Sequence, residues 1–322
     1  MNAGTSQVRM VADVGGTNCR IALFDERSRE FHALAEYHNS DFGCLEQILD
    51  TWLAQLEEEP PTRACIAAAA PPGGDQVNMI NIGWSFSCRE LARRFGLREL
   101  TWLNDFQANA HSLPHLGAAD LELIHAGQEG RPGTLATVGP GTGLGGATLQ
   151  WVAGVPVACD SEPGHTGLSP VTDLELEIFR ALLPEYGEIH AELLVSGSGL
   201  ARLYRTIAEL NGAAAEDLSP ADVSTRALAA SDQQCIVALE TFCALLGSAC
   251  GDYVLSNGAY GGLFIAGGIV PRMTGFLRGS DFLHRFQAKG AMQEHLTAVP
   301  VRVITAAHPG LVGAANAPLQ AS

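Results

Sequence analysis

The stretch Val11-Ala-Asp-Val-Gly-Gly-Thr-Asn-Cys-Arg20 decides the fold of this chain. A short apolar strand is expected to end at Asp13, and a second strand, Ile21–Phe24, follows the glycines at once. Adjacent glycines let the backbone take positive φ and approach a ligand closely, and the N–H groups of such a turn form an anion-binding concavity. An acid beside a phosphate site is placed to hold a hydrated Mg²⁺. An ordinary Gly-Gly β-hairpin has the same pattern, so this stretch alone leaves phosphate binding open.

The residues that follow predict an α/β domain, because short apolar segments alternate with stretches of helical spacing. Ala64–Ala70 is a continuous small, apolar run, which is typical of a strand buried on both faces of a parallel sheet. The expected elements are strands at 8–13, 19–25, 31–37, 64–70 and 100–103, and helices at 45–56 and from the N-cap Ser87 to about Phe95.

The second half repeats this alternation after a hinge predicted near 110–130. The expected elements are strands at 134–138, 147–152 and 302–305, a buried strand within 261–271, helices at 172–183, from the 195–199 loop to Leu210, from Ser219-Pro220 and at 232–256, and a helical tail.

Composition limits the classes of protein. The chain has 322 residues, 47% of them hydrophobic, with 36 glycines. Single cores stop growing at roughly 250–300 residues, so two domains are expected. The net charge of −16 argues against binding along a nucleic-acid backbone and against anionic membrane surfaces.

The spacing of the cysteines and the pattern of the first residues predict that the protein is located in the reducing cytoplasm. None of the 8 cysteines forms a C-x-x-C pair, so neither a zinc site nor a redox motif is predicted. Cys235, Cys243 and Cys250 share one helix face, which is typical of buried small apolar residues. The first residues lack the pattern of a signal peptide, and no apolar run approaches about 18 residues, so no membrane span is expected.

A second glycine turn follows the strand at 134–138, and a third lies within 261–271. The second contains G-x-G-x-x-G at Gly141, Gly143 and Gly146, the pattern of a dinucleotide fingerprint. That fingerprint must open a helix, whereas Ala147–Val152 has the pattern of a strand. A phosphate-binding hairpin, with Thr142 as a hydroxyl donor, fits better. No G-x-x-x-x-G-K-[ST] motif occurs, so a P-loop is excluded.

Asn104-Asp105 ends a buried strand and starts a helix. Ligands of α/β sheets bind at strand ends, so Asp105 is a candidate base that accepts the proton of a hydroxyl attacking a γ-phosphate. Alternatively, Asp105 is simply the helix N-cap. Glu162 and His165 lie in a polar turn, where surface residues and ligands of a polyol are both consistent with the sequence. Glu192 lies between helices, and alone it is most simply a solvated glutamate.

Together these motifs resemble the sugar-kinase and actin-like ATPase superfamily, and most closely the bacterial glucokinase family that lacks the zinc motif. The resemblance covers essentially the whole chain, in order. The segments that carry it are Asp13–Asn18, Leu103–Phe106, Gly139–Gly145, Glu162–His165, Ala191–Gly197, Phe264–Arg272 and Pro309–Gly313. One departure is Pro163, where the family often has glycine; it leaves both ligands of the E-x-G-H clamp in place.

The resemblance implies an α/β fold of the two-domain, actin-like ATPase (ribonuclease H-like) type with an interdomain cleft. Residues 1–110 plus 306–322 would form the small domain, and residues 111–305 the large one. It also implies ATP-dependent phosphorylation of glucose to glucose 6-phosphate, at the entry of glycolysis, by a cytoplasmic homodimer. Sugar binding would drive closure and so keep water from consuming ATP.

The resemblance also implies roles for individual residues. Asp105 would be the general base, and Asp13 would hold Mg²⁺ through water. The residues expected to bind glucose are Asn104, Asp105, Glu162, His165 and Glu192. The residues expected to bind ATP are Ala12, Asp13, Val14, Gly15, Gly16, Thr17, Asn18, Gly141, Thr142, Gly143, Gly267 and Gly268.

Other functions remain open at this point. A kinase of the same fold for another hexose would use the same polyol ligands. A non-catalytic sugar or nucleotide sensor needs no base, so the presence of Asp105 counts against it. A dehydrogenase, suggested by G-x-G-x-x-G alone, ranks last.

Overall fold

The computed structural model describes residues 7–71, 73–79, 81–128 and 130–319. The chain divides into two compact units. The first comprises residues 1–116, 151–160 and 307–322, and the second comprises residues 117–150 and 161–306. This division differs from the expected domains chiefly in residues 151–160, which group with the first unit.

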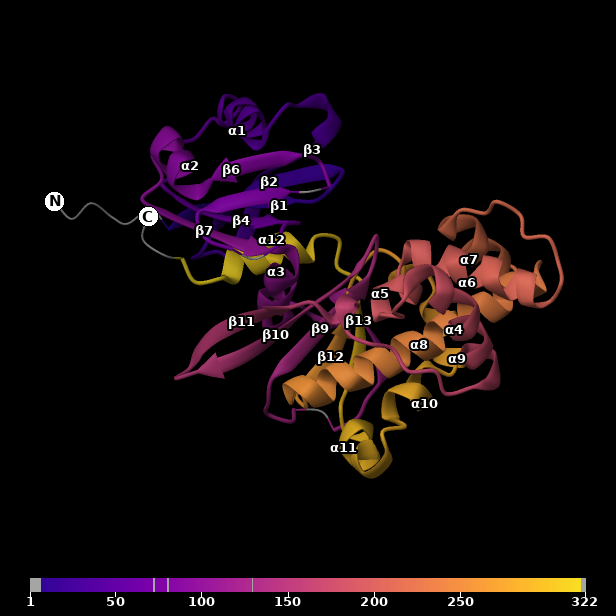
Figure 1. The fold of residues 1–322 in the computed structure, drawn as a ribbon. Coiled ribbons are helices and arrows are strands. Elements are labelled where there is room, and N and C mark those ends of the chain that lie inside the picture. The colour runs from indigo at the N-terminus through magenta and orange to yellow at the C-terminus, as the bar shows by residue number, and fades with distance from the viewer. Residues whose placement is uncertain (1–6, 72, 80, 129, 320–322) are drawn as a thin grey trace. The chain divides into compact units, whose positions relative to one another are not determined.

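The elements within the described residues are given below in chain order, and Figure 1 labels them where there is room. The strands are β1 (Val8–Val14), β2 (Asn18–Asp25), β3 (Glu30–His38), β4 (Arg63–Ala68), β5 (Gln76–Met79), β6 (Trp84–Ser87), β7 (Glu99–Asn104), β8 (Leu121–His125), β9 (Leu135–Pro140), β10 (Leu144–Val152), β11 (Val155–Ser161), β12 (Gly262–Ile265) and β13 (Val301–Ile304). The α-helices are α1 (Leu45–Leu53), α2 (Cys88–Phe95), α3 (Asp105–Ser112), α4 (Asp173–Tyr186), α5 (Ala191–Leu194), α6 (Gly197–Leu210), α7 (Pro220–Leu228), α8 (Gln233–Asn257), α9 (Thr274–Gly279), α10 (Phe282–Gln287), α11 (Gln293–Thr297) and α12 (Pro309–Asn316).

The first unit is built on a five-stranded sheet with the order β3-β2-β1-β4-β7. The β1–β2 hairpin is antiparallel, whereas β1, β4 and β7 run parallel. Side chains alternate between the faces of a strand. Met10 of β1 therefore packs in the cluster that contains residues of α1 and α2, whereas Val11 packs with α3 and α12.

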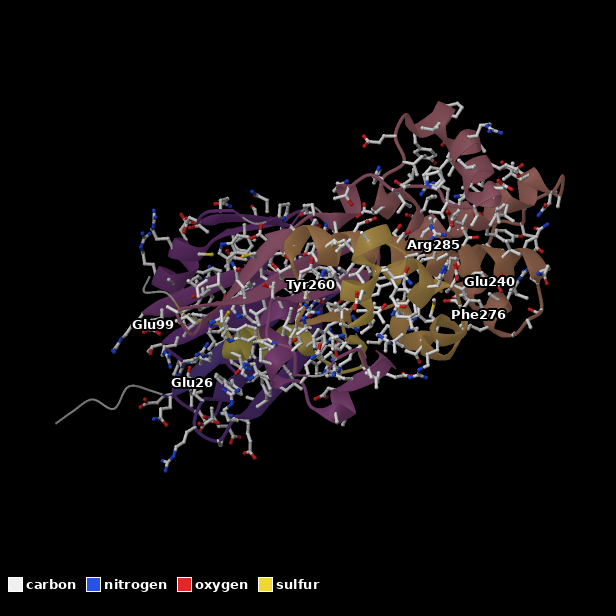
Figure 2. All side chains as sticks on the ribbon, turned by 90° about the horizontal axis from the view of Figure 1, so that it is seen from below. Glu26, Glu99, Glu240, Tyr260, Phe276 and Arg285 are labelled. Atoms are coloured by element: carbon white, nitrogen blue, oxygen red, sulfur yellow. The ribbon has the colours of Figure 1, made fainter. Side chains whose placement is uncertain are left out.

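The two ends of this sheet differ in chemistry. At the amino ends of the parallel strands, Arg63 Nη1 binds Glu26 at 2.7 Å and its Nε binds Glu99 at 2.8 Å; Figure 2 labels both glutamates. At the carboxyl ends, Val14 pairs with Ala68, and Ala68 pairs with Asn104. The first glycine turn and Asn104-Asp105 thus continue from neighbouring strands of one sheet edge.

Helix α12 brings the C-terminal segment back onto this sheet, where it packs on α3. Gly313 of α12 lies against the backbone of Ala108 in α3, so closely that a Cβ on Gly313 would overlap the Ala108 carbonyl oxygen. Glycine at this position therefore sets the distance between the two helices.

The second unit is built around β9, β12, β13 and β8, which belong to a six-stranded sheet with the order β11-β10-β9-β12-β13-β8. Its core combines buried residues of β9, β12 and β13 with those of α4, α6, α8 and α10. The parallel neighbours β9 and β12 pair Val138 with Ile265, so that their glycine turns begin side by side.

Helix α8 is, among the described residues, the one helix that is long and apolar enough to cross a membrane, with a hydropathy of 1.5 over its most apolar window. That window is 72% buried within the structure, and a core helix passes the same test of length and composition. Cys235, Cys243 and Cys250 are buried in this helix, as the sequence predicted.

Most of the predicted elements are confirmed, with ends that differ by a few residues. The predicted hinge loop is wrong in one respect, since it contains β8, which pairs with β13 at an edge of the sheet. The sequence analysis also missed β5, β6 and β11.

Candidate active site

The first glycine turn is tightly closed by its own backbone. Gly15 N donates to Asn18 O at 2.9 Å, and Asn39 donates from its backbone N to Thr17 O at 2.8 Å. The Asn39 side-chain amide donates to Gly15 O at 2.8 Å. Gly16 and Thr17 are exposed at the tip. A Cβ on Gly16 would have its nearest neighbour 4.0 Å away, so the tip leaves room for a ligand close to the backbone.

The other residues predicted in this motif are less accessible. Ala12 and Val14 have fully buried side chains in β1. Asn18 Oδ1 is buried and has no hydrogen-bond partner among the described residues. A polar group of this kind is costly unless it meets a partner, so Asn18 is suited to a ligand or a water at the turn.

Asp13 lies at the carboxyl end of β1, against the start of α12. A Cβ on Gly310 would lie 2.5 Å from Asp13 Oδ2, so glycine at 310 is needed to admit the carboxylate. Burial raises the pKa of Asp13, while the charges of Arg20 and His308 act in the opposite direction.

The Asp13 carboxylate fits a Mg²⁺ ion that is held through water rather than by direct protein ligands. The described residues contain no group of three or more His, Cys, Asp or Glu side chains that could bind a metal directly. Mg²⁺ usually keeps several waters and binds through one or two carboxylates plus substrate phosphates. A single carboxylate next to a turn that the sequence predicts to bind phosphate agrees with that pattern.

Asn104 is the N-cap of α3, so the alternative in which Asp105 is the cap is wrong. Asn104 Oδ1 accepts a hydrogen bond from Phe106 N at 2.9 Å, and Asn104 Nδ2 donates to Ala70 O at 2.9 Å. Asp105 is the first residue of the helix, and its Oδ1 accepts from Phe106 N at 3.0 Å. The cap thus fixes the start of the helix and with it the Asp105 backbone.

The second glycine turn connects β9 and β10 and is followed by a strand, as the sequence predicted. Gly141 N donates to Gly143 O at 2.8 Å, and Gly141 O accepts from Gly197 N, at the start of α6, also at 2.8 Å. Thr142 is exposed at the tip. A Cβ on Gly141 would meet nothing within 4 Å, so no contact among the described residues requires glycine there.

The third turn lies directly against the second. Gly267 has φ +86°, and a Cβ there would lie 2.5 Å from Pro140 O. A Cβ on Gly139 would lie 2.8 Å from the carbonyl carbon of Ala266. Gly268, next to this contact, is exposed and faces open space.

Glu162 and His165 are exposed on a short 3-10 turn, Pro163–His165. Pro163 is buried, and a Cβ on Gly146 would lie 2.7 Å from its Cγ, so this proline holds the turn on β10. The His165 and His190 rings lie 5.3 Å apart. Both predicted ligands therefore point from a well-packed turn into solvent.

Glu192 makes contacts within the protein that the sequence did not predict. Its Oε2 accepts from Leu144 N at 2.9 Å, and a Cβ on Gly164 would lie 3.1 Å from the same oxygen. The carboxylate therefore joins the second glycine turn to the turn that carries Glu162 and His165. Within the second unit, the predicted phosphate and sugar ligands lie together.

Several residues that support the site were not predicted from the sequence. Gln107 Oε1 accepts from Asn104 N at 3.0 Å, which completes a capping box that the spacing of 104 and 107 could have revealed. Asn39 and Gly310 support the Asp13 turn from distant parts of the chain. Gly310 falls within the Pro309–Gly313 segment of the resemblance, whereas no local pattern marks Asn39.

Comparison with known proteins identifies relatives over nearly the full length. The family model described as Glucokinase matches residues 10–321. A glucokinase of Chromobacterium violaceum is 42% identical over 307 residues, which are 95% of this chain and 88% of that protein. A glucokinase of Nitrobacter hamburgensis is 38% identical over 321 residues, which are 99% of this chain and 100% of that protein.

Solved structures agree with the fold. A glucokinase from an Antarctic psychrotroph superposes with a TM-score of 0.88 at 39% identity, over 96% of this chain and 98% of that one. A ROK-family glucokinase from Streptomyces griseus, solved with glucose and AMPPNP, gives a TM-score of 0.63 at 18% identity, over 96% and 98% of the chains. The predicted actin-like ATPase fold is confirmed.

Proposed function

Because the chain belongs to the glucokinase family, we propose that it transfers the γ-phosphoryl group of ATP to the 6-hydroxyl of glucose. The observation that carries this proposal in the structure is Asp105, which starts α3 at the carboxyl end of β7. The Asp13 turn lies at the same edge of the same sheet, two strands away. A base and a phosphate-binding turn at one sheet edge are what phosphoryl transfer to a hydroxyl needs.

Asp105 accepts the proton of the 6-hydroxyl as its oxygen attacks the γ-phosphorus. The Phe106 N–H, which donates to Asp105 Oδ1, orients the carboxylate. General-base catalysis of this kind contributes about 10²–10⁴-fold to a rate. The remaining catalysis comes from holding the two substrates in line.

The residues that we propose to bind the glucose hydroxyls are Asn104, Asp105, Glu162, His165 and Glu192. Asn104 already uses Oδ1 and one N–H within the protein, which leaves one N–H to donate to a sugar oxygen. Glu192 keeps one carboxylate oxygen for the sugar, because its hydrogen bond to Leu144 N uses Oε2.

ATP phosphates are bound by backbone N–H groups of Gly15–Asn18 and Gly141–Gly143, and the adenosine lies against Gly267-Gly268. Asp13 would hold Mg²⁺ through water, and the ion would supply positive charge that offsets the phosphates. The solved ATP-analogue complex of the Streptomyces griseus protein supports ATP as the donor. Backbone donors and a cation suit a chain whose net charge is −16.

We further propose that the protein is a cytoplasmic homodimer that feeds glucose into glycolysis. All 8 cysteines are free thiols in the structure, which is the state expected in a reducing compartment. Sedimentation of the purified protein tests the dimer, which is expected at twice the mass of 33.9 kDa.

The function is tested by ADP release from the purified protein across glucose, mannose, fructose and an amino sugar, with and without Mg²⁺. We expect turnover with glucose at the highest kcat/KM and none when Mg²⁺ is chelated. A higher kcat/KM for another hexose would reassign the substrate. Absence of turnover with every sugar, despite binding of glucose and ATP, would favour a sensor.

A further inference from the structure

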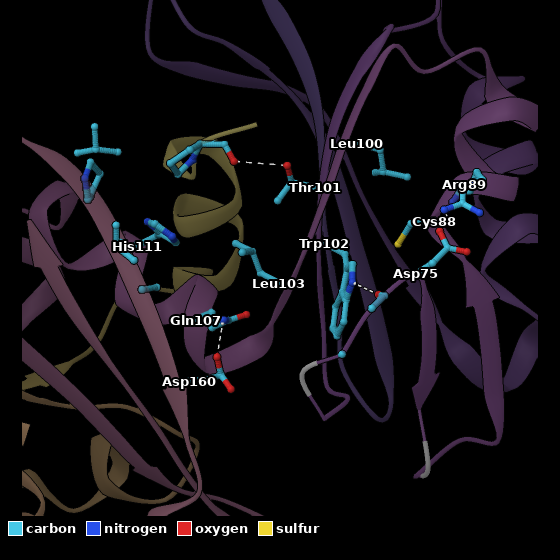
Figure 3. A pocket seen from close by; sticks show the side chains of 17 residues that line it. Asp75, Cys88, Arg89, Leu100, Thr101, Trp102, Leu103, Gln107, His111 and Asp160 are labelled. Atoms are coloured by element: carbon cyan, nitrogen blue, oxygen red, sulfur yellow. Dashed lines mark hydrogen bonds between the residues drawn. The ribbon is translucent and has the colours of Figure 1, made fainter. Parts of the chain in front are cut away.

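Gln107 uses both ends of its side chain amide. Oε1 accepts from Asn104 N at 3.0 Å, at the start of the helix that carries Asp105. Nε2 donates to Asp160 Oδ1 at 2.9 Å, on β11. Figure 3 shows this second hydrogen bond as a dashed line in the wall of a cavity of about 820 Å³. Helix capping requires only the first of these two interactions.

Asp160 occupies a particular place in the chain. It is the last residue of the segment 151–160 that groups with the first unit, and Ser161 begins the return to the second. Two hydrogen bonds hold the Ser161 side chain: its hydroxyl lies 2.6 Å from the Tyr253 hydroxyl and donates to Gly146 O at 3.2 Å. Glu162, a proposed sugar ligand, comes next.

We propose that Gln107 is a positioning residue, which links the Asp105 turn to the strand that leads into Glu162. This inference rests on the proposed function, because it assigns Asp105 as base and Glu162 as sugar ligand. The hydrogen bond from Gln107 to Asp160 fixes the start of α3, with the backbone of the base, against the strand whose chain reaches the sugar ligand two residues later. Gln107 itself contacts neither substrate.

The proposed link requires glutamine at 107, because glutamate has no side-chain N–H group to donate to Asp160. A glutamate at 107 keeps an oxygen acceptor for Asn104 N, and glutamate also serves at this position of a capping box. It lacks the N–H group that binds Asp160, and it places a second carboxylate beside that residue. Gln107→Glu therefore breaks the link to Asp160 and leaves the helix cap intact.

The test uses Gln107→Glu, Asp160→Asn and the double variant, at a pH on the plateau of the wild-type rate profile. For Gln107→Glu we expect an about tenfold lower kcat/KM for glucose, the size of one hydrogen bond to a charged group. KM for ATP and the Tm stay near those of the wild type. In the double variant the asparagine amide donates to the new carboxylate, and kcat/KM returns to within about threefold of wild type.

Gln47→Glu is the matched control. Gln47 Oε1 accepts from Gly43 N at 2.7 Å at the start of α1, so this substitution also keeps a helix-start acceptor and adds a charge. We expect unchanged kinetics. A Gln107→Glu variant with wild-type kcat/KM, or a loss that the double variant does not reverse, would overturn the proposal.

Deuterium uptake separates this proposal from the proposed function, because it needs no activity. In the absence of ligand, Gln107→Glu is expected to raise uptake in peptides 104–112 and 155–162 together, and the double variant to restore it. If the wild type does not phosphorylate glucose, the proposed function fails, while unchanged uptake in Gln107→Glu would overturn the link itself.

Discussion

At the scale of single residues, Asp13 combines a cost to the stability of the fold with a proposed role in function. Burial favours its protonated form, so the pKa of Asp13 is higher in the fold than the value of about 3.9 in an unfolded chain. Its contribution to stability is therefore fully present below about pH 3.9 and is lost as the pH rises through the folded pKa. A carboxylate kept at such a position is typical of a functional site.

Asp13→Asn is consequently expected to raise the Tm at pH 7 and to have a much smaller effect near pH 3. The same substitution should lower kcat about 10- to 100-fold, as removal of an outer-shell group of a metal site does. Thermal melts at the two pH values and a glucose kinase assay measure both effects.

Asp25→Asn is the matched control, at the other end of the same hairpin. Backbone hydrogen bonds from Ser28 and Arg27 lower the pKa of Asp25, so its contribution to stability is present above the unfolded pKa and lost in acid. This substitution should lower the Tm at pH 7. If Asp13→Asn also lowers it, the account of Asp13 fails.

His111, buried in α3, makes the first unit sensitive to acid. Burial, with a smaller effect of His115, lowers the pKa of His111 to about 4. Its stabilising contribution is present above the unfolded pKa of about 6.5 and is lost as the pH falls towards 4, on the order of 2–3 kcal/mol in all. His111→Gln should therefore lose less stability between pH 6.5 and pH 4 than the wild type. If urea denaturation gave the same change in unfolding free energy with pH for the wild type and for His111→Gln, this account would be contradicted.

At the scale of elements, the contact of α12 with α3 sets the position of Asp105. Gly313→Ala would drive a methyl group into the Ala108 carbonyl, so α3 or α12 must shift. We expect a loss of about 1–3 kcal/mol and a lower kcat, because Asp105 starts α3. Gly275→Ala is the control: this helical glycine in α9 has nothing within 4 Å of a Cβ, so alanine should be neutral or slightly stabilising.

The helices of the second unit contain a buried ion pair. Arg285 of α10 binds Glu175 of α4 at 2.6 Å, with 4% and 3% of their side chains exposed; Figure 2 labels Arg285. Ser248 of α8 lies 3.2 Å from the same guanidinium. The pair thus joins three helices of one core.

Arg285→Met should destabilise the second unit by about 3–5 kcal/mol, because it leaves a buried carboxylate without its partner. Glu175 also accepts from Val171 N at 2.7 Å, so Glu175→Gln keeps an acceptor for that group. The double variant Glu175→Gln/Arg285→Met is therefore expected to be more stable than Arg285→Met alone in chemical denaturation. An equal or lower stability of the double variant would contradict the account.

Elements with strong local signals could be predicted. Ser87, Thr172 and Ser219 each accept from the backbone N–H three residues on, as their sequences indicated. Strand β8 could not be predicted in the same way, because it is a partly buried edge strand whose pairing with β13 lies far away in sequence. Helix and strand signals are local, whereas edge pairing is not.

At the scale of the whole molecule, the order of motifs carried more information than any motif alone. The Gly-Gly turn at Asp13 matches any hairpin. The order of three glycine turns around Asn104-Asp105 was what indicated a kinase. The contacts that support these motifs could not be read from the chain, since Glu192 and Leu144, or Asp13 and Gly310, meet only in the fold.

The most direct test of the central claim compares glucose 6-phosphate formation by the wild type and by Asp105→Asn, with glucose binding measured on both by calorimetry. Asparagine keeps the shape of the side chain and removes the base. We predict that kcat falls at least about 10²-fold, within the range of general-base catalysis, while glucose still binds. Near-normal turnover by Asp105→Asn would show that Asp105 is not the base.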